Sequence, residues 1–144
     1  MQARRLRVRM LGGQEPPAYA HEGDAGLDLR AAEDATLQPG QSRLVGTGVA
    51  VEVPQGCVGL LFPRSGLGSK GVTLRNAVGV IDSGYRGEVK AALWNTTGDV
   101  FDVHAGDRVC QLVVMPYVPC GLELADELSE TERGEDGYGS TGVK

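Results

Sequence analysis

The sequence predicts one all-β domain, a jelly-roll-like barrel or sandwich with at most one short helix. The chain has 144 residues, enough for a single domain with its own core. Apolar residues make up 41% of it, which favours folding over disorder. Its 22 glycines and 7 prolines are scattered without a period, a distribution typical of many turns between short strands.

The amino-terminal half shows clear strand patterns. Residues 5–10 alternate between arginine and apolar side chains, the period of a half-buried strand. We interpret these arginines as a solvated strand face in preference to a phosphate-binding patch. A short strand is expected over residues 27–31. Residues 36–62 are expected to form three strands, separated by turns at residues 39–40 and 54–56.

The carboxy-terminal half is expected to continue in strands. Residues 76–95 are predicted to form a β-hairpin, because two apolar runs flank residues 82–84 and Gly84 suits the left-handed position of a three-residue loop. Two more strands are expected within residues 99–118. The acidic residues 121–132 are expected to form coil or a short helix.

Charge and composition argue against several functional classes. The net charge of −5 speaks against nucleic acid as the main partner, because duplex-binding proteins present broad basic faces. No apolar run approaches the ~20 residues that cross a bilayer, and the arginine-rich start lacks the apolar region of a signal peptide. Three cysteines without a CxxC motif indicate reduced thiols and a cytoplasmic location, with Cys57 and Cys110 as core residues.

Residues 63–71 are a candidate phosphate-binding loop. A helical turn with Ser65 as its N-cap would direct free backbone N–H groups outward, where they attract anions. Glycines after Ser65 let a phosphate approach the backbone, and Arg64 adds a fork of donors. Lys70 is followed by glycine, so this is not a Walker loop. A plain glycine turn with an exposed arginine fits the same residues equally well.

Residues 76–88 are candidates for the chemistry. Asp82 ends an uncharged apolar run, and a carboxylate at the edge of a core can orient and deprotonate a water molecule. Asn76 can donate and accept hydrogen bonds, which suits the edge of an amide-like base, and Tyr85 follows across the turn. Taken separately, Asp82 is interpreted as a turn residue and Asn76 as a strand-end residue.

Two further segments carry candidate ligand-binding side chains. Gln111 interrupts an apolar strand, and a buried amide needs partners from the backbone or from an adjacent site. Residues 133–142 hold Arg133, Tyr138 and four glycines. Alone, this segment is typical of a disordered tail. Combined with the phosphate-type loop and the isolated carboxylate, it predicts a lid that closes on a ligand.

The chain resembles the trimeric dUTPases, the all-β deoxyuridine triphosphate nucleotidohydrolases. The five motifs of that family occur in order, and together with their spacing they cover nearly the whole chain. The motifs are AGLDLRA (25–31), PRSGLGSKG (63–71), NAVGVIDSGYRGEVKAAL (76–93), GDRVCQLVV (106–114) and RGEDGYGSTG (133–142).

The resemblance implies hydrolysis of dUTP to dUMP and pyrophosphate with Mg²⁺. Asp82 matches the aspartate that activates the attacking water, and Asp28 matches an aspartate that contacts the metal only through water. The implied substrate-binding residues are Asn76, Gly79, Val80, Ile81 and Lys90 at the uracil edge, Tyr85 at the deoxyribose, Arg64, Ser65, Gly66, Gln111 and Arg133 at the phosphates, Tyr138 stacked on uracil, and Ser140.

The resemblance also implies how the chain is organised. Residues 1–144 would form one dUTPase domain, with residues 133–144 as a flexible lid. Three copies would form a homotrimer whose active sites are shared between subunits, with no nucleic acid or membrane as partner. Two positions depart from the family pattern. Gly84 replaces a frequent acid in the turn, where little effect is expected, and Asp136 replaces a glycine in the lid, where its charge would weaken closure.

Two alternatives stay open. The related dCTP deaminases use a glutamate at the position of Ala92, which cannot act as an acid or base. A non-catalytic nucleotide-binding homologue would use the same pocket to engage a partner protein. The intact Asp82 argues against this second alternative, and Asp136 leaves it open.

Overall fold

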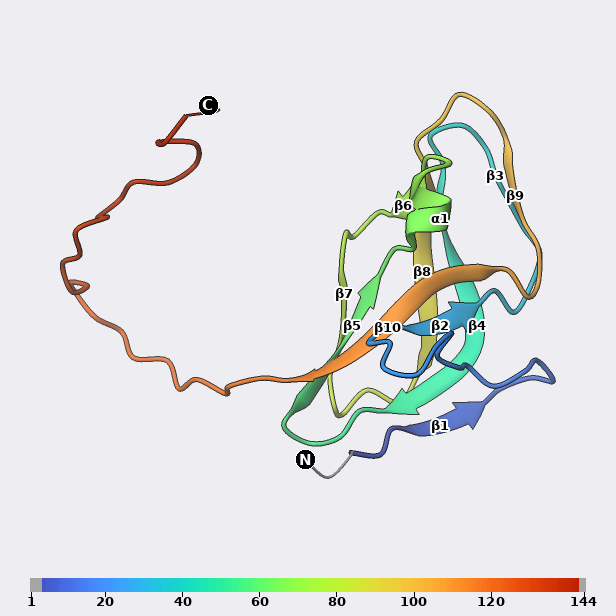
Figure 1. Cartoon of the computed structure of the whole chain (residues 1–144), viewed down its shortest axis with the longest axis horizontal. Helices are drawn as coiled ribbons and strands as arrows, with labels where there is room; N and C mark the ends of the chain where they lie inside the picture. The colour runs from blue at the N-terminus through green and yellow to red at the C-terminus, as the bar shows by residue number, and fades with distance from the viewer. Residues whose placement is uncertain (1–3, 143–144) are drawn as a thin grey trace.

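The computed structural model describes residues 4–142, which form ten strands and one four-residue helix (Figure 1). The elements are β1 (Arg7–Met10), β2 (Leu27–Arg30), β3 (Ala35–Leu37), β4 (Ser42–Glu52), β5 (Cys57–Phe62), α1 (Ser65–Gly68), β6 (Val72–Leu74), β7 (Gly79–Ile81), β8 (Glu88–Asn95), β9 (Phe101–Val103) and β10 (Arg108–Pro116).

Two four-stranded antiparallel sheets make up the body of the molecule. Their strand orders are β1-β4-β8-β6 and β2-β10-β5-β7, and β3 and β9 form a separate two-stranded ribbon. This arrangement confirms the predicted all-β, jelly-roll-like sandwich. Within residues 4–142, no helix has the length and apolar character that a membrane crossing requires.

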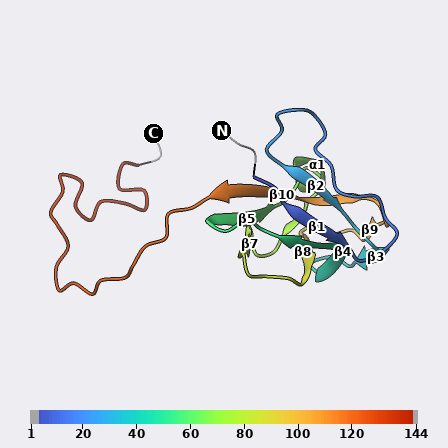
Figure 2. The ribbon, with the colours of Figure 1, turned by 90° about the horizontal axis from the view of Figure 1, so that it is seen from below.

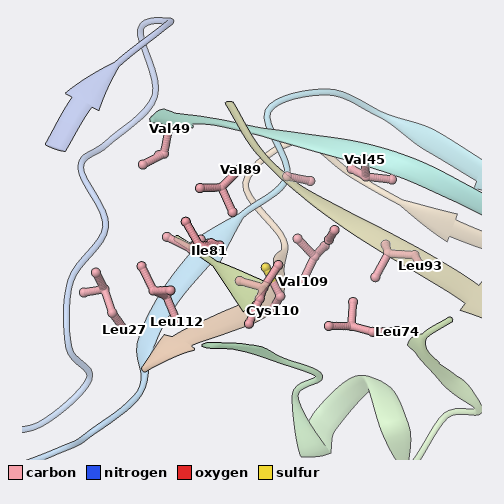
Figure 3. Close-up of a cluster of buried hydrophobic side chains, with 14 of the residues drawn as sticks. Leu27, Val45, Val49, Leu74, Ile81, Val89, Leu93, Val109, Cys110 and Leu112 are labelled. Atoms are coloured by element: carbon pink, nitrogen blue, oxygen red, sulfur yellow. The ribbon is translucent and has the colours of Figure 1, made fainter. Parts of the chain in front are cut away.

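The core lies between the inner faces of the two sheets. Side chains on β5 and β8 alternate between buried and partly exposed, because successive residues of a strand point to opposite faces. Figure 3 shows Val89 and Leu93 from one sheet beside Cys110 and Leu112 from the other. Cys57 and Cys110 are both buried in this cluster, as predicted from the sequence.

The predicted turns of the amino-terminal half are confirmed. Gly40 and Gly56 adopt φ values of 74° and 77°, the left-handed region that glycine enters without steric cost. The chain reverses at both positions and places β3, β4 and β5 in three different strand pairings. The glycine residues therefore predict the positions of these turns correctly, although they do not specify which strands pair.

The predicted hairpin over residues 76–95 is wrong. β7 pairs with β5, whereas β8 pairs with β4 and β6, so the two strands belong to different sheets. Gly84 does not adopt a positive φ, because residues 82–87 cross from one sheet to the other and form no tight hairpin loop. The sequence reading also missed β6, whose three residues pair with the end of β8.

The chain leaves the sandwich after β10. Residues 117–142 extend away from both sheets, as the two views in Figures 1 and 2 show. The acidic residues 121–132 form coil, one of the two predicted outcomes. Leu122, Leu124 and Leu128 in this arm are 98%, 101% and 89% exposed, so this stretch packs its apolar side chains against no other part of residues 4–142.

Candidate functional site

One group of predicted site residues gathers at the carboxy-terminal end of β5. Arg64 follows this strand, and its Nε donates to Oδ1 of Asp28 on β2 at 2.8 Å. Nη1 of Arg108 on β10 lies 3.5 Å from the other carboxylate oxygen. The Asp28 side chain is only 13% exposed, and a buried carboxylate needs polar partners, which the two guanidinium groups supply.

Gln111 belongs to the same group. The strand register places it beside Asp28 on β2 and beside Phe62 on β5. Its Nε2 donates to the carbonyl oxygen of Pro63 at 3.2 Å, so the amide has a backbone partner. Its Oε1 occupies the space next to Gly26, where any Cβ would overlap it. The glycine of the first motif therefore makes room for the glutamine of the fourth.

Helix α1 carries the predicted phosphate-loop residues Ser65 and Gly66. The N-cap is Arg64, with φ −96° and ψ 140°, and not Ser65 as predicted. The reason is that the carbonyl of Arg64 already accepts the first helical hydrogen bond, from the N–H of Gly68 at 2.9 Å. A Cβ built at Gly66 or Gly68 would meet nothing within 4 Å, so one side of this turn is open to a ligand.

A pocket of about 360 Å³ opens beside Asp28. Its charged lining includes Glu15, Arg30 and Arg108, and Arg30 is anchored by a 2.8 Å hydrogen bond from its Nη1 to the carbonyl of Gly106. Across residues 4–142, no three His, Cys, Asp or Glu side chains gather as a metal-binding cluster. Asp28 and Glu15 are the carboxylates that line this pocket.

Cys110 lies under this first group and takes no part in its chemistry. Burial raises the pKa of its thiol to about 12; the nearby Asp28 carboxylate adds to the rise and Arg64 opposes it. The thiol is protonated at neutral pH and packs as a small apolar side chain.

A second group of predicted residues lies on β7 and on the segment that follows it. Ile81 pairs with Gly59, which places Asp82 at the amino-terminal end of β5. Asp82 shares a pocket of about 290 Å³ with Cys57 and Val58. The carboxylate is exposed there, so water can reach it.

Asn76 approaches β7 through a strained stretch of backbone. A Cβ built at Gly79 would lie 3.5 Å from Nδ2 of Asn76, so this amide lies against the strand. Ala77 adopts a φ of 61°, and the N–H of Val78 donates to the Asn76 carbonyl at 2.6 Å. A non-glycine residue in this region costs ~1–3 kcal/mol and is typical of functional sites. Nothing in the sequence singled out Ala77.

Tyr85 and Arg86 close the segment after Asp82. The N–H of Tyr85 donates to the Asp82 carbonyl at 3.1 Å, and its hydroxyl donates to the Glu88 carbonyl at 2.9 Å. Nη1 of Arg86 donates to the carbonyls of Ser83 and Tyr85, at 2.6 and 3.0 Å. The sequence reading did not select Arg86, because a single exposed arginine gives no sign of which carbonyls it will bind.

Backbone edges near this group have no strand partner within residues 4–142. β7 pairs only with β5, and its Val80 is 66% exposed. Lys90 on β8 pairs with Gly46 of β4, whereas β6 pairs only with residues 93–95 of β8. The first half of β8, like β7, therefore presents one free edge to a ligand. Lys90 lies on the other sheet from Gly79, Val80 and Ile81.

The predicted residues of the last motif lie apart from both groups. Arg133 donates from Nε to the carbonyl of Asp136 at 2.8 Å, and the N–H of Ser140 donates to the Gly137 carbonyl at 3.0 Å. Tyr138 is fully exposed and adopts a φ of 48°. This segment has local turns and stands away from the sandwich (Figure 1).

The first two groups are separated by the length of β5. Asp82 lies next to Val58, and Arg64 follows the far end of the strand. At about 3.3 Å per residue, the distance from Val58 to Arg64 is roughly 20 Å. Within one chain, Arg64 and Asp82 therefore lie near opposite ends of β5.

Comparison with known proteins gives one consistent family. The family model described as dUTPase matches residues 14–142. The deoxyuridine 5'-triphosphate nucleotidohydrolase of Hahella chejuensis is 48% identical over 141 residues, covering 94% of this chain and 93% of that protein. The protein of the same name from Azoarcus sp. is 46% identical over 145 residues, covering 96% and 97%.

Solved structures agree with this result. The dUTPase of Staphylococcus bacteriophage 80alpha with dUPNHPP is 31% identical, with a TM-score of 0.90 and coverage of 98% of this chain and 100% of that one. A mutant dUTPase from phage phi11 of S. aureus, described for its coordination of a structural Mg(II) ion, is 30% identical, with a TM-score of 0.79 and coverage of 86% and 98%.

Proposed function

Because this chain belongs to the dUTPase family, we propose that it hydrolyses dUTP to dUMP and pyrophosphate. The observation that carries the proposal is the β7 region. There an amide (Asn76), a strand with a free edge, an exposed carboxylate (Asp82) and an aromatic ring (Tyr85) follow one another along a short stretch of backbone. Groups of these kinds, close together, could bind the base of a nucleotide, position a water molecule and pack against the sugar.

Uracil is the proposed base. Asn76 and the free backbone edge at Gly79, Val80 and Ile81 would bond its polar edge, with Lys90 contributing from the free edge of β8. Cytosine presents a donor where uracil presents an acceptor, so fixed donors and acceptors that fit uracil would be left unpaired by cytosine. Such a mismatch can lower kcat/KM by ~10⁴-fold. The strained φ of Ala77 supports this role, since strain persists where surrounding structure fixes a functional geometry.

Asp82 is the proposed general base. Its carboxylate would accept a proton from a water molecule whose oxygen forms a bond to the α-phosphorus. The bond between that phosphorus and the bridging oxygen then breaks, and the electron pair leaves with pyrophosphate. The exposure of Asp82 in its pocket, with no salt bridge among residues 4–142, supports this assignment because the carboxylate is free to bind water.

Arg64, Ser65, Gly66 and Gln111 are the proposed phosphate ligands of the first group. The open side of α1 leaves room for phosphate oxygens, and Arg64 is held in place by Asp28 before any ligand arrives. A pre-positioned guanidinium favours charged oxygens without further ordering. Arg133, Tyr138 and Ser140 would be delivered by residues 133–144 as a lid.

Mg²⁺ is the proposed cofactor, and the residues present fit it. Asp28 offers the hard oxygen donors that this ion prefers, and it lines a pocket of about 360 Å³. Each oxygen of Asp28 already faces an arginine, so contact with the ion through a water molecule fits better than direct ligation. When bound, the ion would offset charge on the leaving pyrophosphate.

A homotrimer with shared active sites is the proposed assembly. The roughly 20 Å between Arg64 and Val58, the neighbour of Asp82, no longer separates the two groups if each site takes them from different subunits. The arm after β10 supports the same conclusion, because Leu122, Leu124 and Leu128 are almost fully exposed in a single chain. The arm also carries the lid away from its own sandwich (Figure 2).

Mixing inactive variants tests the shared site. Asp82→Asn and Arg64→Ala are each expected to be inactive, yet trimers refolded from an equal mixture should recover activity in about a quarter of their sites, because a symmetric ring combines an intact Asp82 with an intact Arg64 from its neighbour. The readout is pyrophosphate release. In the matched control, Asp82→Asn is mixed with Asn76→Ala; these residues share one β7 region, so no activity should return. If neither mixture released pyrophosphate, the proposal of shared sites would be contradicted.

A substrate panel tests the reaction itself. With Mg²⁺ and a set of deoxynucleoside and ribonucleoside triphosphates, the protein should release pyrophosphate from dUTP and far less from dCTP, dTTP or UTP. Release of ammonia from dCTP would indicate the deaminase chemistry instead. Tight dUTP binding without turnover would indicate a non-catalytic nucleotide-binding protein.

The cell compartment and partners follow from composition. We propose a cytoplasmic location, because all three cysteines are free and Cys120 is exposed, which fits a reducing environment. dUTP is proposed as the ligand in place of nucleic acid or a membrane, consistent with the net charge of −5.

A further inference from the structure

We propose that Gly87 is a positioning residue that fixes the ring of Tyr85 and thereby sets the discrimination between dUTP and UTP. The inference rests on the proposed function, in which Tyr85 packs on the deoxyribose. It concerns a different question, namely what keeps that ring in place.

The ring of Tyr85 lies directly on the backbone of Gly87. A Cβ built at Gly87 would overlap the phenol oxygen, and it would lie 2.6 Å from Cζ and 3.1 Å from Cε2 of Tyr85. Carbon atoms that are not bonded to each other pack at about 3.5–4.0 Å. Any side chain at position 87 therefore displaces the ring.

Gly87 is required for space and not for backbone conformation. It does not adopt a positive φ, so alanine could take the same backbone geometry without strain. Gly84 lies in the same segment, also has no positive φ, and has no atom within 4 Å of a built Cβ. The two glycines therefore differ in what their hydrogens face, which makes Gly84 a matched control.

The backbone at residues 87–88 is a firm support for the ring. The Tyr85 hydroxyl donates to the carbonyl of Glu88 at 2.9 Å. Glu88 begins β8, and its own Oε1 accepts a hydrogen bond from the N–H of Gly48 in β4 at 2.9 Å. The support is thus tied to the neighbouring strand and not left as a free loop.

The other end of Tyr85 is also held. Its N–H donates to the Asp82 carbonyl, and its own carbonyl accepts from Arg86 at 3.0 Å. With the main chain and the hydroxyl both fixed, the ring has little freedom, while 45% of the residue stays exposed to a ligand. Rejection of a 2′-hydroxyl by bulk requires such a wall, because a ring that yields by about 1 Å can admit one more oxygen atom.

The test compares Gly87→Ala with Gly84→Ala. The measured quantity is the ratio of kcat/KM for dUTP to kcat/KM for UTP. We expect Gly87→Ala to lower this ratio by roughly 10- to 100-fold, since displacing a positioned group by about 1 Å has effects of that order. Gly84→Ala should leave the ratio within about twofold of the starting protein, because its methyl group meets open space.

A double-mutant cycle shows whether Gly87 acts through Tyr85. Tyr85→Ala alone should lower the ratio, and adding Gly87→Ala to it should change the ratio little further, because no ring remains to be displaced. A merely structural role for Gly87 would lower activity on both substrates alike and would leave the ratio unchanged. That loss of activity would also be the same with or without the Tyr85 ring.

A second variant keeps the test decisive if Gly87→Ala does not fold. Tyr85→Phe keeps the ring and the backbone but removes the hydrogen bond to Glu88, and it should lower the ratio by about 3- to 10-fold. A ratio unchanged in both Gly87→Ala and Tyr85→Phe would overturn the inference. If the unmodified protein does not hydrolyse dUTP at all, the proposed function itself fails, and that outcome is separate.

Discussion

Replacement of Asp82 by asparagine is expected to lower kcat for dUTP by roughly 10²–10⁴-fold, the typical worth of a positioned general base. Asparagine keeps the size of the side chain and still accepts a hydrogen bond, so dUTP should bind with a nearly unchanged Kd. What is lost is the proton acceptor, because an amide oxygen is far less basic than a carboxylate. Pyrophosphate release and equilibrium binding of a non-hydrolysable dUTP analogue measure the two properties separately.

Asp102→Asn is the matched control for this variant. Asp102 is also an exposed aspartate, and it lies on β9, where its Oδ1 accepts a hydrogen bond from Thr36 that asparagine can also accept. Its kcat should stay within about twofold of the starting protein. Turnover retained in Asp82→Asn would remove Asp82 from its proposed role, and loss of binding in parallel with turnover would make it a substrate ligand.

Deletion of residues 133–144 is expected to leave a folded trimer that hydrolyses dUTP at least ~10²-fold less efficiently. The sandwich should be unaffected, because Arg133, Tyr138 and Ser140 lie in a segment that stands away from it (Figure 1). Catalysis should fall, because a closing segment excludes water and completes the set of phosphate ligands. Size-exclusion chromatography with light scattering reports the trimer, and pyrophosphate release reports the activity.

Deletion of residues 143–144 alone provides the control, because it leaves the RGEDGYGSTG motif intact. Its kcat/KM should match that of the full chain. Full activity after removal of residues 133–144 would contradict the lid. A truncated protein that no longer forms a trimer would show that the segment contributes to assembly and not only to closure.

Much of the fold could be predicted because its signals are local. The alternation of buried and exposed residues along β5 and β8 follows from the period of a strand, and Gly40 and Gly56 mark turns that only their own backbone requires. Strand pairing is not a local property. Residues 76–95 contain two apolar runs around a turn-like segment, yet their strands find partners in different sheets.

The candidate site shows the same difference between local signals, which the sequence carries, and non-local contacts, which it does not. Asp82 and Asn76 could be singled out by residue type, and so could Arg64. The contact between Arg64 and Asp28 joins residues 36 positions apart, and the sequence does not show it. No sequence signal distinguishes Arg86 or Gly87, because their roles depend on the carbonyls and the ring that the fold places beside them. The second and third motifs are neighbours in sequence, but Arg64 and Asp82 flank opposite ends of β5.

The length of β5 has a consequence for inheritance and dosage. In the proposed assembly each polypeptide contributes its arginine to one catalytic centre and its aspartate to another, so a chain that has lost both groups disables two centres of the ring. When half of the chains have lost both groups, only about a quarter of the centres keep an intact pair, and no intact chain could work in isolation at high dilution. Catalysis of this kind is a property of the ring, and the single polypeptide is only its building unit.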